Sequence, residues 1–164
     1  MKRFSRALYD KHDKRAKDIA KDFFSFLNFE IIDDGEHYGD YDFAIKSNDK
    51  IQTVEVEQKT QWYGKPFPFR TMDVAGRKKK SKADWFIQIN NDGTSFNICK
   101  MSVVHSSEQY RKNTIYSTNE LFFAVERDQF TTIYKDDCVW VIPCLPRNGQ
   151  PNSKLYADDL LCLL

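Results

Sequence analysis

The segment "YDFAIKSNDKIQTVEVEQKTQW", residues 41–62, contains two apolar runs separated by a short polar link. We expect strands over Tyr41–Lys46 and Ile51–Thr60, because β-branched and aromatic residues fill both runs. The link "SNDK" is rich in turn-forming residues, so the two strands should form a hairpin. This hairpin is the starting point for both the fold and the function.

The second strand of this hairpin carries ionised side chains at every other position. Successive side chains of a strand point to opposite faces, so Glu55, Glu57 and Lys59 share one face and the intervening valines take the other. If the first strand pairs antiparallel, Asp42 can lie near Glu57. Two clustered carboxylates repel each other unless a cation or proton lies between them, and hard oxygen ligands select Mg²⁺, Mn²⁺ or Ca²⁺. A lysine beside such a pair can stabilise the charge that develops on a phosphate.

The rest of the chain alternates helical and strand periodicity. A helix is expected over Ser5–Leu27, ended by Asn28, and a loop over Gly64–Gly76. The segment "AGRKKKSKA" favours a short basic helix, and "NDG" predicts a hairpin between two later strands. A further helix is expected after Ser106 or Ser107. The remaining expected strands are Phe29–Ile32, Asp84–Asn90, Ser95–Met101, Leu121–Val125 and Cys138–Cys144.

This alternation predicts an α/β or α+β fold with a sheet covered by helices. The 164 residues suit a single domain, with a core over about residues 5–101 and residues 102–164 as a C-terminal extension of it.

Composition excludes several classes of protein. The 25 Lys and Arg residues nearly cancel the 24 Asp and Glu residues, so the net charge carries no nucleic-acid signature. The four cysteines lack zinc or disulfide-framework spacing, and we expect reduced, mostly buried thiols. The opening residues lack the apolar core of a signal peptide, and no apolar run is long enough to span a membrane. We therefore expect a cytoplasmic protein without a membrane partner.

The pattern Asp42…Glu57-Gln58-Lys59, with a helix before it and a basic segment after it, resembles the signature of the PD-(D/E)XK nuclease superfamily. The resemblance covers about residues 16–90 and implies a restriction endonuclease-like core, a central mixed sheet flanked by helices. It implies metal binding by Asp42, Glu57 and the backbone carbonyl of Gln58, and a catalytic role for Asp42, Glu57 and Lys59. The implied cofactor is Mg²⁺, with Mn²⁺ also accepted, and the implied substrate is DNA.

The chain departs from the family pattern at two places. Tyr41 replaces the proline that usually precedes the aspartate. No glutamate occurs before Glu30, whereas many members carry one in the first helix; Asp18 lies nearest to that position and is a candidate further ligand. Asp40 is a rival for the role of Asp42.

Basic and aromatic residues follow this hairpin. Beside a site that cleaves phosphodiesters they gain a role in binding nucleic acid, because cationic side chains neutralise backbone phosphates and aromatic rings stack on bases. Alternatively, the charges form a solvated face and the rings cap the edge of a core. Glu55 could assist a second metal ion or be solvated, and we expect it to be solvated. The predicted contacts are Arg77, Lys78, Lys79, Lys80, Lys82 and Trp62.

These features predict a Mg²⁺-dependent deoxyribonuclease, an endonuclease. Its small size suggests a phage- or mobile-element-like enzyme, or a structure-selective one, acting in the host cytoplasm if phage-encoded. Specificity would come from DNA shape or from a homodimer. RNA stays open as a substrate. Two alternatives also stay open: a non-catalytic nucleic-acid-binding module on the same fold, and an interaction protein whose charged strand face meets a partner chain.

Overall fold

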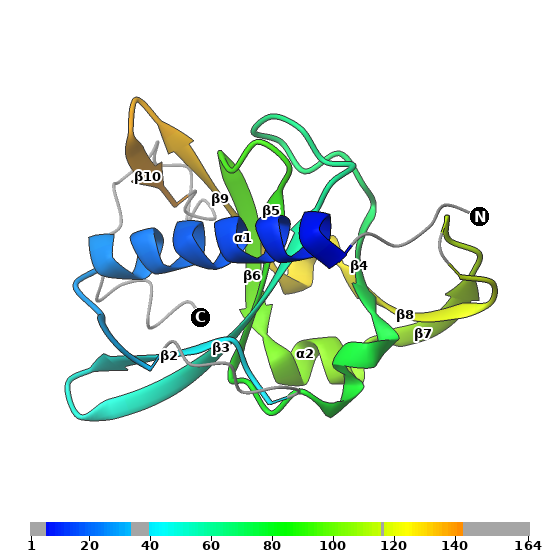
Figure 1. Cartoon of the computed structure of the whole chain (residues 1–164), viewed down its shortest axis with the longest axis horizontal. Coiled ribbons are helices and arrows are strands. Elements are labelled where there is room, and N and C mark those ends of the chain that lie inside the picture. Colours follow the sequence, from blue (N-terminus) through cyan, green and yellow to red (C-terminus); the bar gives the residue numbers. More distant parts are fainter. Residues whose placement is uncertain (1–5, 34–39, 116, 143–164) are drawn as a thin grey trace, which may run out of the picture.

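The computed structural model describes residues 6–33, 40–115 and 117–142. Its larger sheet has seven strands in the order β1-β2-β3-β5-β6-β9-β10 (Figure 1). The sheet is mixed, because β3 and β5 pair in parallel and its other neighbours pair antiparallel. Its strands are β1 (Glu30–Asp33), β2 (Phe43–Ser47), β3 (Lys50–Lys59), β5 (Trp85–Asn90), β6 (Ser95–Lys100), β9 (Thr131–Asp136) and β10 (Val139–Val141).

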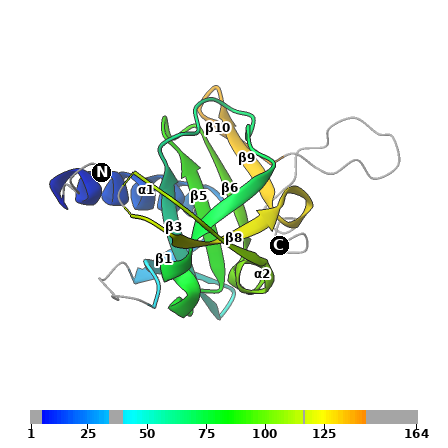
Figure 2. The same cartoon turned by 90° about the vertical axis from the view of Figure 1, so that its right-hand side faces the viewer.

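The two faces of this sheet are covered differently. Helix α1 (Arg6–Phe26) lies on one face, and β8 and the short helix α2 (Met101–Ser106) lie on the other (Figure 2). A second sheet with the order β4-β8-β7 forms this second layer. Its strands are β4 (Thr71–Ala75), β7 (Glu108–Lys112) and β8 (Glu120–Glu126), with the 3₁₀ helices η1 (Gly76–Lys80) after β4 and η2 (Arg127–Gln129) after β8.

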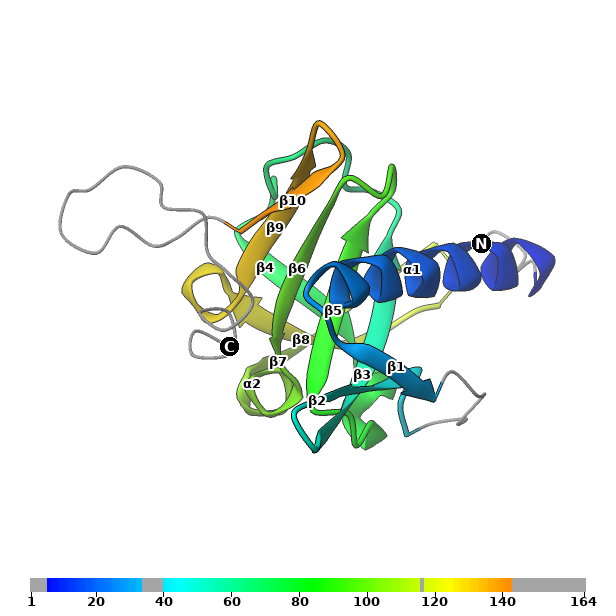
Figure 3. The same cartoon turned by 90° about the vertical axis from the view of Figure 1, so that its left-hand side faces the viewer.

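Local backbone chemistry fixes the turns next to the candidate site. Asn28 has a φ of 63°, the left-handed conformation that ends α1. Asn48 and Asp49 have φ values of 48° and 58°, as a two-residue hairpin turn between β2 and β3 requires. Strands β1, β2 and β3 therefore lie side by side next to α1 (Figure 3).

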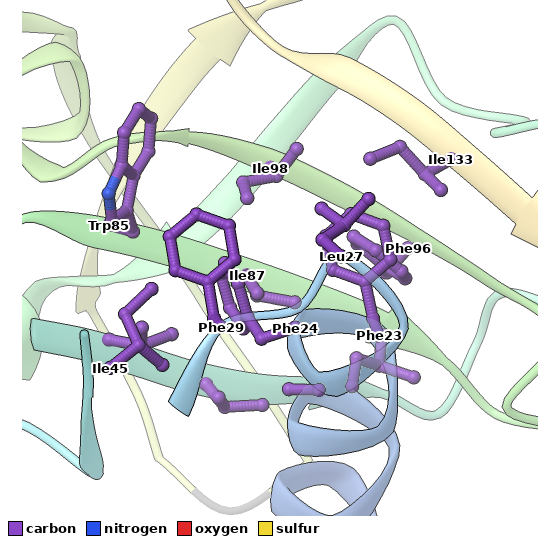
Figure 4. Packing of buried hydrophobic residues seen from close by; sticks show 14 of the residues in the cluster. Phe23, Phe24, Leu27, Phe29, Ile45, Trp85, Ile87, Phe96, Ile98 and Ile133 are labelled. Carbon is purple, nitrogen blue, oxygen red and sulfur yellow. The ribbon is translucent and has the colours of Figure 1, made fainter. Parts of the chain in front are cut away.

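The core between α1 and the large sheet is aromatic. Phe23 is fully buried and makes edge-to-face contacts with Phe24, Phe96 and Trp140, at ring-centroid distances of 5.4, 4.8 and 5.7 Å. Figure 4 shows Phe23 and Phe24 of α1 facing the isoleucines of β5 and β6. Val54 and Val56 of β3 belong to this core, as the two-residue periodicity predicts.

A second core lies between the two sheets. Trp62 is 0% exposed, and its ring contacts Phe67 at a centroid distance of 5.0 Å. Its indole Nε1 donates a hydrogen bond to the carbonyl of Pro66 at 2.9 Å. The other face of β3 and β5 is thus covered by protein as well.

The mixed α/β class and both expected hairpins are confirmed. The loop expected over Gly64–Gly76 was partly wrong, because β4 forms within it by pairing with the distant β8. The helix expected after Ser106 was also wrong, since α2 ends there and β7 follows. Strand β9 was not predicted, and the last expected strand is limited to Val139–Val141 within the described residues. Residues 102–142 thus supply strands to both sheets.

Two further expectations can be compared with the described residues. Cys99 is buried, as expected for most of the thiols, and burial raises its pKa to about 12, whereas Cys138 is exposed. Cys144 and Cys162 lie outside the described residues. No helix in the described part of the chain is long and apolar enough to cross a membrane.

Phe23→Ala should lower the free energy of unfolding by about 3–5 kcal/mol, because it removes a fully buried ring and leaves a cavity. Phe26→Ala on the same helix is the matched control: its ring is 50% exposed, and we expect a change within about 0.5 kcal/mol. Denaturant unfolding of both variants measures this. Equal losses would contradict the assignment of Phe23 to the core.

Candidate functional site

The site begins where β3 extends beyond its partner β2. The pairing of the two strands stops at Phe43 and Val54, whereas β3 continues to Lys59. Asp42 directly precedes β2 in the sequence and lies along this open edge of β3. Its backbone N–H donates a hydrogen bond to Val54 O at 2.8 Å. Its Oδ2 accepts a hydrogen bond from the N–H of Val56 at 2.7 Å. The carboxylate of Asp42 is thereby fixed against the open edge of β3.

The register sets how Asp42 lies relative to the acids of β3. Because Phe43 pairs with Val54, Asp42 comes opposite Glu55, with Glu57 diagonally beyond it. Cα atoms at such diagonal positions are typically about 7–8 Å apart. The hydrogen bond to Val56 draws the Asp42 carboxylate toward the residue between the two glutamates.

The backbone of Gln58 faces the same open edge. Backbone groups of alternate residues in a strand point to the same side. Val54 O and Val56 N both bond to Asp42 on that side, so the carbonyl of Gln58 points there too. The predicted third oxygen ligand is consistent with this strand geometry.

A lysine of α1 holds the second oxygen of Asp42. Lys17 Nζ lies 2.9 Å from Asp42 Oδ1 and 2.8 Å from Asp13 Oδ2. Burial lowers the pKa of Lys17, but its hydrogen bonds to Asp13 and Asp42 outweigh this and raise it above its ordinary value. Asp18, the predicted helix ligand, is exposed. The α1 acid linked to Asp42 is Asp13, because Lys17 pairs with both.

Glu55 is a buried residue, contrary to the expectation that it is solvated. It forms an ion pair with Lys78 of η1 and accepts a hydrogen bond from Ser81 Oγ at 3.1 Å. Burial raises the pKa of Glu55; Lys78 opposes this, and the nearby charge of Asp42 adds to it. The Lys78 side chain is 13% exposed, so its ammonium serves the protein interior and not a phosphate at the surface.

Glu57 lies at the centre of the charged face. Its side chain is 16% exposed, and its Oε2 lies 3.8 Å from a guanidinium nitrogen of Arg77. This oxygen is buried and accepts no hydrogen bond from any group in the described part of the chain. A buried carboxylate oxygen without a donor is costly, and a bound cation or a proton would relieve that cost.

Lys59 ends the row and lies over the ring of Phe69, at 5.4 Å from its centroid. Burial lowers the pKa of Lys59, and the charges of Asp73 and Glu57 oppose this shift. Asp73 of β4 is in turn ion-paired with Lys112 of β7. The Lys59 ammonium is thus partly desolvated and lies near acids from two strands.

The predicted nucleic-acid contacts fall into two groups. Lys79, Lys80 and Lys82 are exposed, and the Arg77 side chain is 52% exposed beside Glu57. The Lys78 ammonium pairs with Glu55 in the protein interior. The Trp62 indole is fully buried and has no free face on which a base could stack. For these two residues the expected surface contact is therefore replaced by a structural role.

Asp40 does not compete with Asp42 for the site. It forms an ion pair with Lys82 at 3.2 Å, and its carbonyl accepts hydrogen bonds from Lys82 N and Ser81 Oγ, each at 2.9 Å. Asp40 thereby fastens the segment after η1 to the start of β2, whereas Asp42 alone of the two bonds to β3.

The groups at this edge are oxygen donors, the type of ligand that a hard divalent cation takes. Asp42, Glu57 and the Gln58 carbonyl offer oxygen ligands, which Mg²⁺ prefers together with water. Glu57 Oε2, which has no hydrogen-bond donor among the described residues, supports this fit. The ion pair between Lys17 and Asp42 opposes it, because the lysine would compete with a cation for the carboxylate. In the described residues no group of three His, Cys, Asp or Glu side chains is arranged to hold a metal. A site of two carboxylates and a carbonyl does not require such a group.

Several residues of the site were not predicted. The Asp13–Lys17 pair has helical i,i+4 spacing, but nothing local shows that Lys17 also reaches Asp42. The pairing of Asp73 with Lys112 joins residues 39 positions apart, and no sequence signal predicts it.

Neither a protein-family model, a curated protein nor a solved structure matches this chain. Its function is therefore inferred from the residues and their geometry.

Lys78→Met should destabilise the protein by about 3–5 kcal/mol near pH 7, because it leaves the Glu55 carboxylate buried without its ammonium. The raised pKa of Glu55 means that the folded state binds this proton more tightly than the unfolded state. Glu55 therefore favours folding most at low pH. This contribution to stability is lost as the pH rises above 4.5, the ordinary pKa of a glutamate.

Consequently the cost of Lys78→Met should shrink as the pH falls toward 4.5. Chemical unfolding between pH 7 and pH 4.5 measures the effect. Lys79→Met, at an exposed neighbour in η1, serves as the control and should change the free energy of unfolding little at any pH. A pH-independent loss for Lys78→Met would argue against a buried pair.

Proposed function

We propose that this protein is a Mg²⁺-dependent deoxyribonuclease, an endonuclease, on a restriction endonuclease-like core. The observation that carries the proposal is the fixed position of Asp42 on the open edge of β3, where Glu57 and Lys59 project from the same strand. Two acids that could hold a metal ion and a partly desolvated lysine at one strand end are groups that can together hydrolyse a phosphodiester.

The order of elements supports the same proposal. Helix α1 precedes three antiparallel strands, β1 to β3, and the chain then crosses over to β5, which pairs parallel to β3. The resemblance to PD-(D/E)XK nucleases implies this order, with a helix in the crossover. Here the crossover holds β4 and η1, so the second layer is a small sheet.

Each residue has a distinct role in the proposed reaction. Asp42, Glu57 and the carbonyl of Gln58 would hold the ion, which when bound would polarise the phosphate and supply a nucleophilic water. Lys59 stabilises the negative charge that builds on the phosphate oxygens. Hydrolysis joins the oxygen of water to phosphorus and breaks one P–O ester bond, and the leaving oxygen takes a proton.

Exposed cations next to the site suit a polyanionic substrate. Arg77, Lys79, Lys80 and Lys82 lie on or just after η1, which follows β4 directly. Such residues neutralise backbone phosphates without reading sequence. DNA shape, or a homodimer that cuts two strands, would then supply specificity. A cytoplasmic location, in the host cell if the chain is phage-encoded, fits this role.

A second candidate is a nucleic-acid-binding module that does not cleave. The observation that favours it is Lys17, whose ammonium already neutralises Asp42. Calorimetry with Mn²⁺ separates the two candidates: a nuclease should bind the ion and lose binding in Glu57→Gln, whereas a module should show no carboxylate-dependent uptake.

Lys59→Ala should reduce cleavage of DNA at least about a hundred-fold, because it removes the charge that stabilises the transition state, while DNA binding is largely kept. The assay compares supercoiled, linear, single-stranded and four-way DNA, and RNA, with Mg²⁺, Mn²⁺ or EDTA. Lys50→Ala, an exposed lysine at the other end of β3, is the matched control and should cleave at the parent rate.

Asp42→Asn should weaken both metal binding and cleavage, because an amide oxygen is a poorer ligand than a carboxylate. Asp49→Asn makes the same chemical change at the exposed β2–β3 turn and should leave both unchanged. Parent-rate cleavage by Asp42→Asn or Lys59→Ala in Mg²⁺ would refute the assignment.

A further inference from the structure

Two polar rows cross the large sheet beneath the second layer, and each starts at a residue of the proposed site. In the first row, Glu57 pairs with Gln88, Gln88 with Asn97, and Asn97 with Thr132. In the second row, Lys59 pairs with Asn90, and Ser95 follows on β6. These side chains share one face of the sheet, because the residues that alternate with them face the other way, into the core between α1 and the large sheet.

The middle of both rows is completely buried. Gln88, Asn90, Ser95 and Asn97 are each 0% exposed. Such positions inside a sheet are normally apolar, as Phe86 and Cys99 are in the neighbouring row on the same face. Polar residues here must be satisfied internally.

Part of this polar set is satisfied by protein groups. Asn90 Nδ2 donates to Gly64 O at 2.9 Å, and its Oδ1 accepts from the N–H groups of Thr94 and Ser95. Gln88 Nε2 donates to the carbonyl of Asp73 at 3.0 Å, and Asn97 Oδ1 accepts from Thr132 Oγ1 at 2.8 Å. These contacts fix the amide orientations.

Four atoms of the two rows are left over. None of them has a hydrogen-bond partner among the described residues, and all are buried: Glu57 Oε2, Gln88 Oε1, Asn97 Nδ2 and Ser95 Oγ. A buried donor or acceptor without a partner is destabilising, so each of these four atoms calls for one.

The chemistry of these atoms selects water. Two are acceptors only, Asn97 Nδ2 is a donor, and the Ser95 hydroxyl does both. A metal cation cannot satisfy the Asn97 N–H groups, because they need an acceptor. Water donates to the acceptors and accepts from the amide, and buried waters typically make about three such bonds.

We propose that buried water molecules occupy these rows and hydrogen-bond Glu57, so that Gln88 and Asn97 position its carboxylate through water. The positioning role rests on the proposed function, whereas the bound water does not. Glu57 thereby gains the donor that it lacks, and its orientation is set before an ion arrives.

The water is tested directly by ¹⁷O magnetic relaxation dispersion, which detects long-lived internal water. We expect at least one such water in the parent protein and a smaller signal in Ser95→Ala. This variant removes a hydroxyl that bonds to no described protein group, so in a dry site it would leave the unfolding midpoint unchanged or raise it. In a hydrated site the midpoint falls.

Ser47→Ala, at the end of β2 and outside both rows, is the control for the unfolding midpoint. A parent protein without long-lived internal water, together with a Ser95→Ala midpoint no lower than that of Ser47→Ala, would overturn the proposal.

The positioning role is tested by the affinity for Mn²⁺. Asn97→Leu should weaken Mn²⁺ binding about ten-fold, as loss of an outer-shell partner typically does. Ile98→Leu, the next residue on β6 but facing α1, should leave it unchanged. Equal affinity in the parent and a folded Asn97→Leu disproves the positioning role.

The two proposals can fail separately. If the parent protein binds no Mn²⁺, the proposed nuclease function fails, while the relaxation measurement still decides whether water is bound. If Asn97→Leu does not fold, Ser95→Ala takes its place in the titration, since it removes no protein–protein hydrogen bond of its side chain.

Discussion

The structure depends on burying both faces of β3. One face carries Val54 and Val56 and packs on α1, whereas the other carries Glu55, Glu57 and Lys59 and lies under the second layer. A charge taken out of water costs several kcal/mol unless a partner of opposite sign meets it. The second layer must therefore supply charges in register with this strand. Lys78 meets Glu55, Arg77 approaches Glu57, and Asp73 lies near Lys59.

This constraint explains why η1 and β4 occupy the crossover between β3 and β5. The 3₁₀ helix presents consecutive basic residues: Lys78 reaches inward to Glu55, Arg77 lies half-exposed beside Glu57, and the other lysines stay in solvent. Gly76 lets η1 approach β8, because a Cβ at that position would lie 2.7 Å from the Leu121 Cβ. The small sheet is thus the structural support of the charged strand, and the exposed lysines are placed beside the site as a consequence.

The three charges of β3 are not satisfied equally. Glu55 has both an ion pair and a hydrogen bond, whereas one oxygen of Glu57 is buried without a donor. A buried group without a partner calls for an explanation, such as a catalytic role or a bound water or ion. Asp42 shows the complementary arrangement, with Val56 and Lys17 holding one oxygen each. Ion binding at this edge would therefore exchange an internal cation for an external one, and the polar rows behind Glu57 would keep its carboxylate in place.

The sequence by itself determined the local structure: the first helix, the β2–β3 hairpin with its turn, the alternation along β3, and the position of Asp42 before it. These follow from periodicity and turn chemistry, which act over a few residues. Tertiary structure alone decided which residues meet that hairpin. Lys17 reaches Asp42 from α1, Lys78 turns inward to Glu55, Trp62 is buried, and Asp73 pairs with Lys112. Such contacts depend on register and on which distant strands pair, as β4 does with β8. No local pattern encodes them, because a basic or aromatic side chain looks the same in the sequence whether it faces solvent or the core.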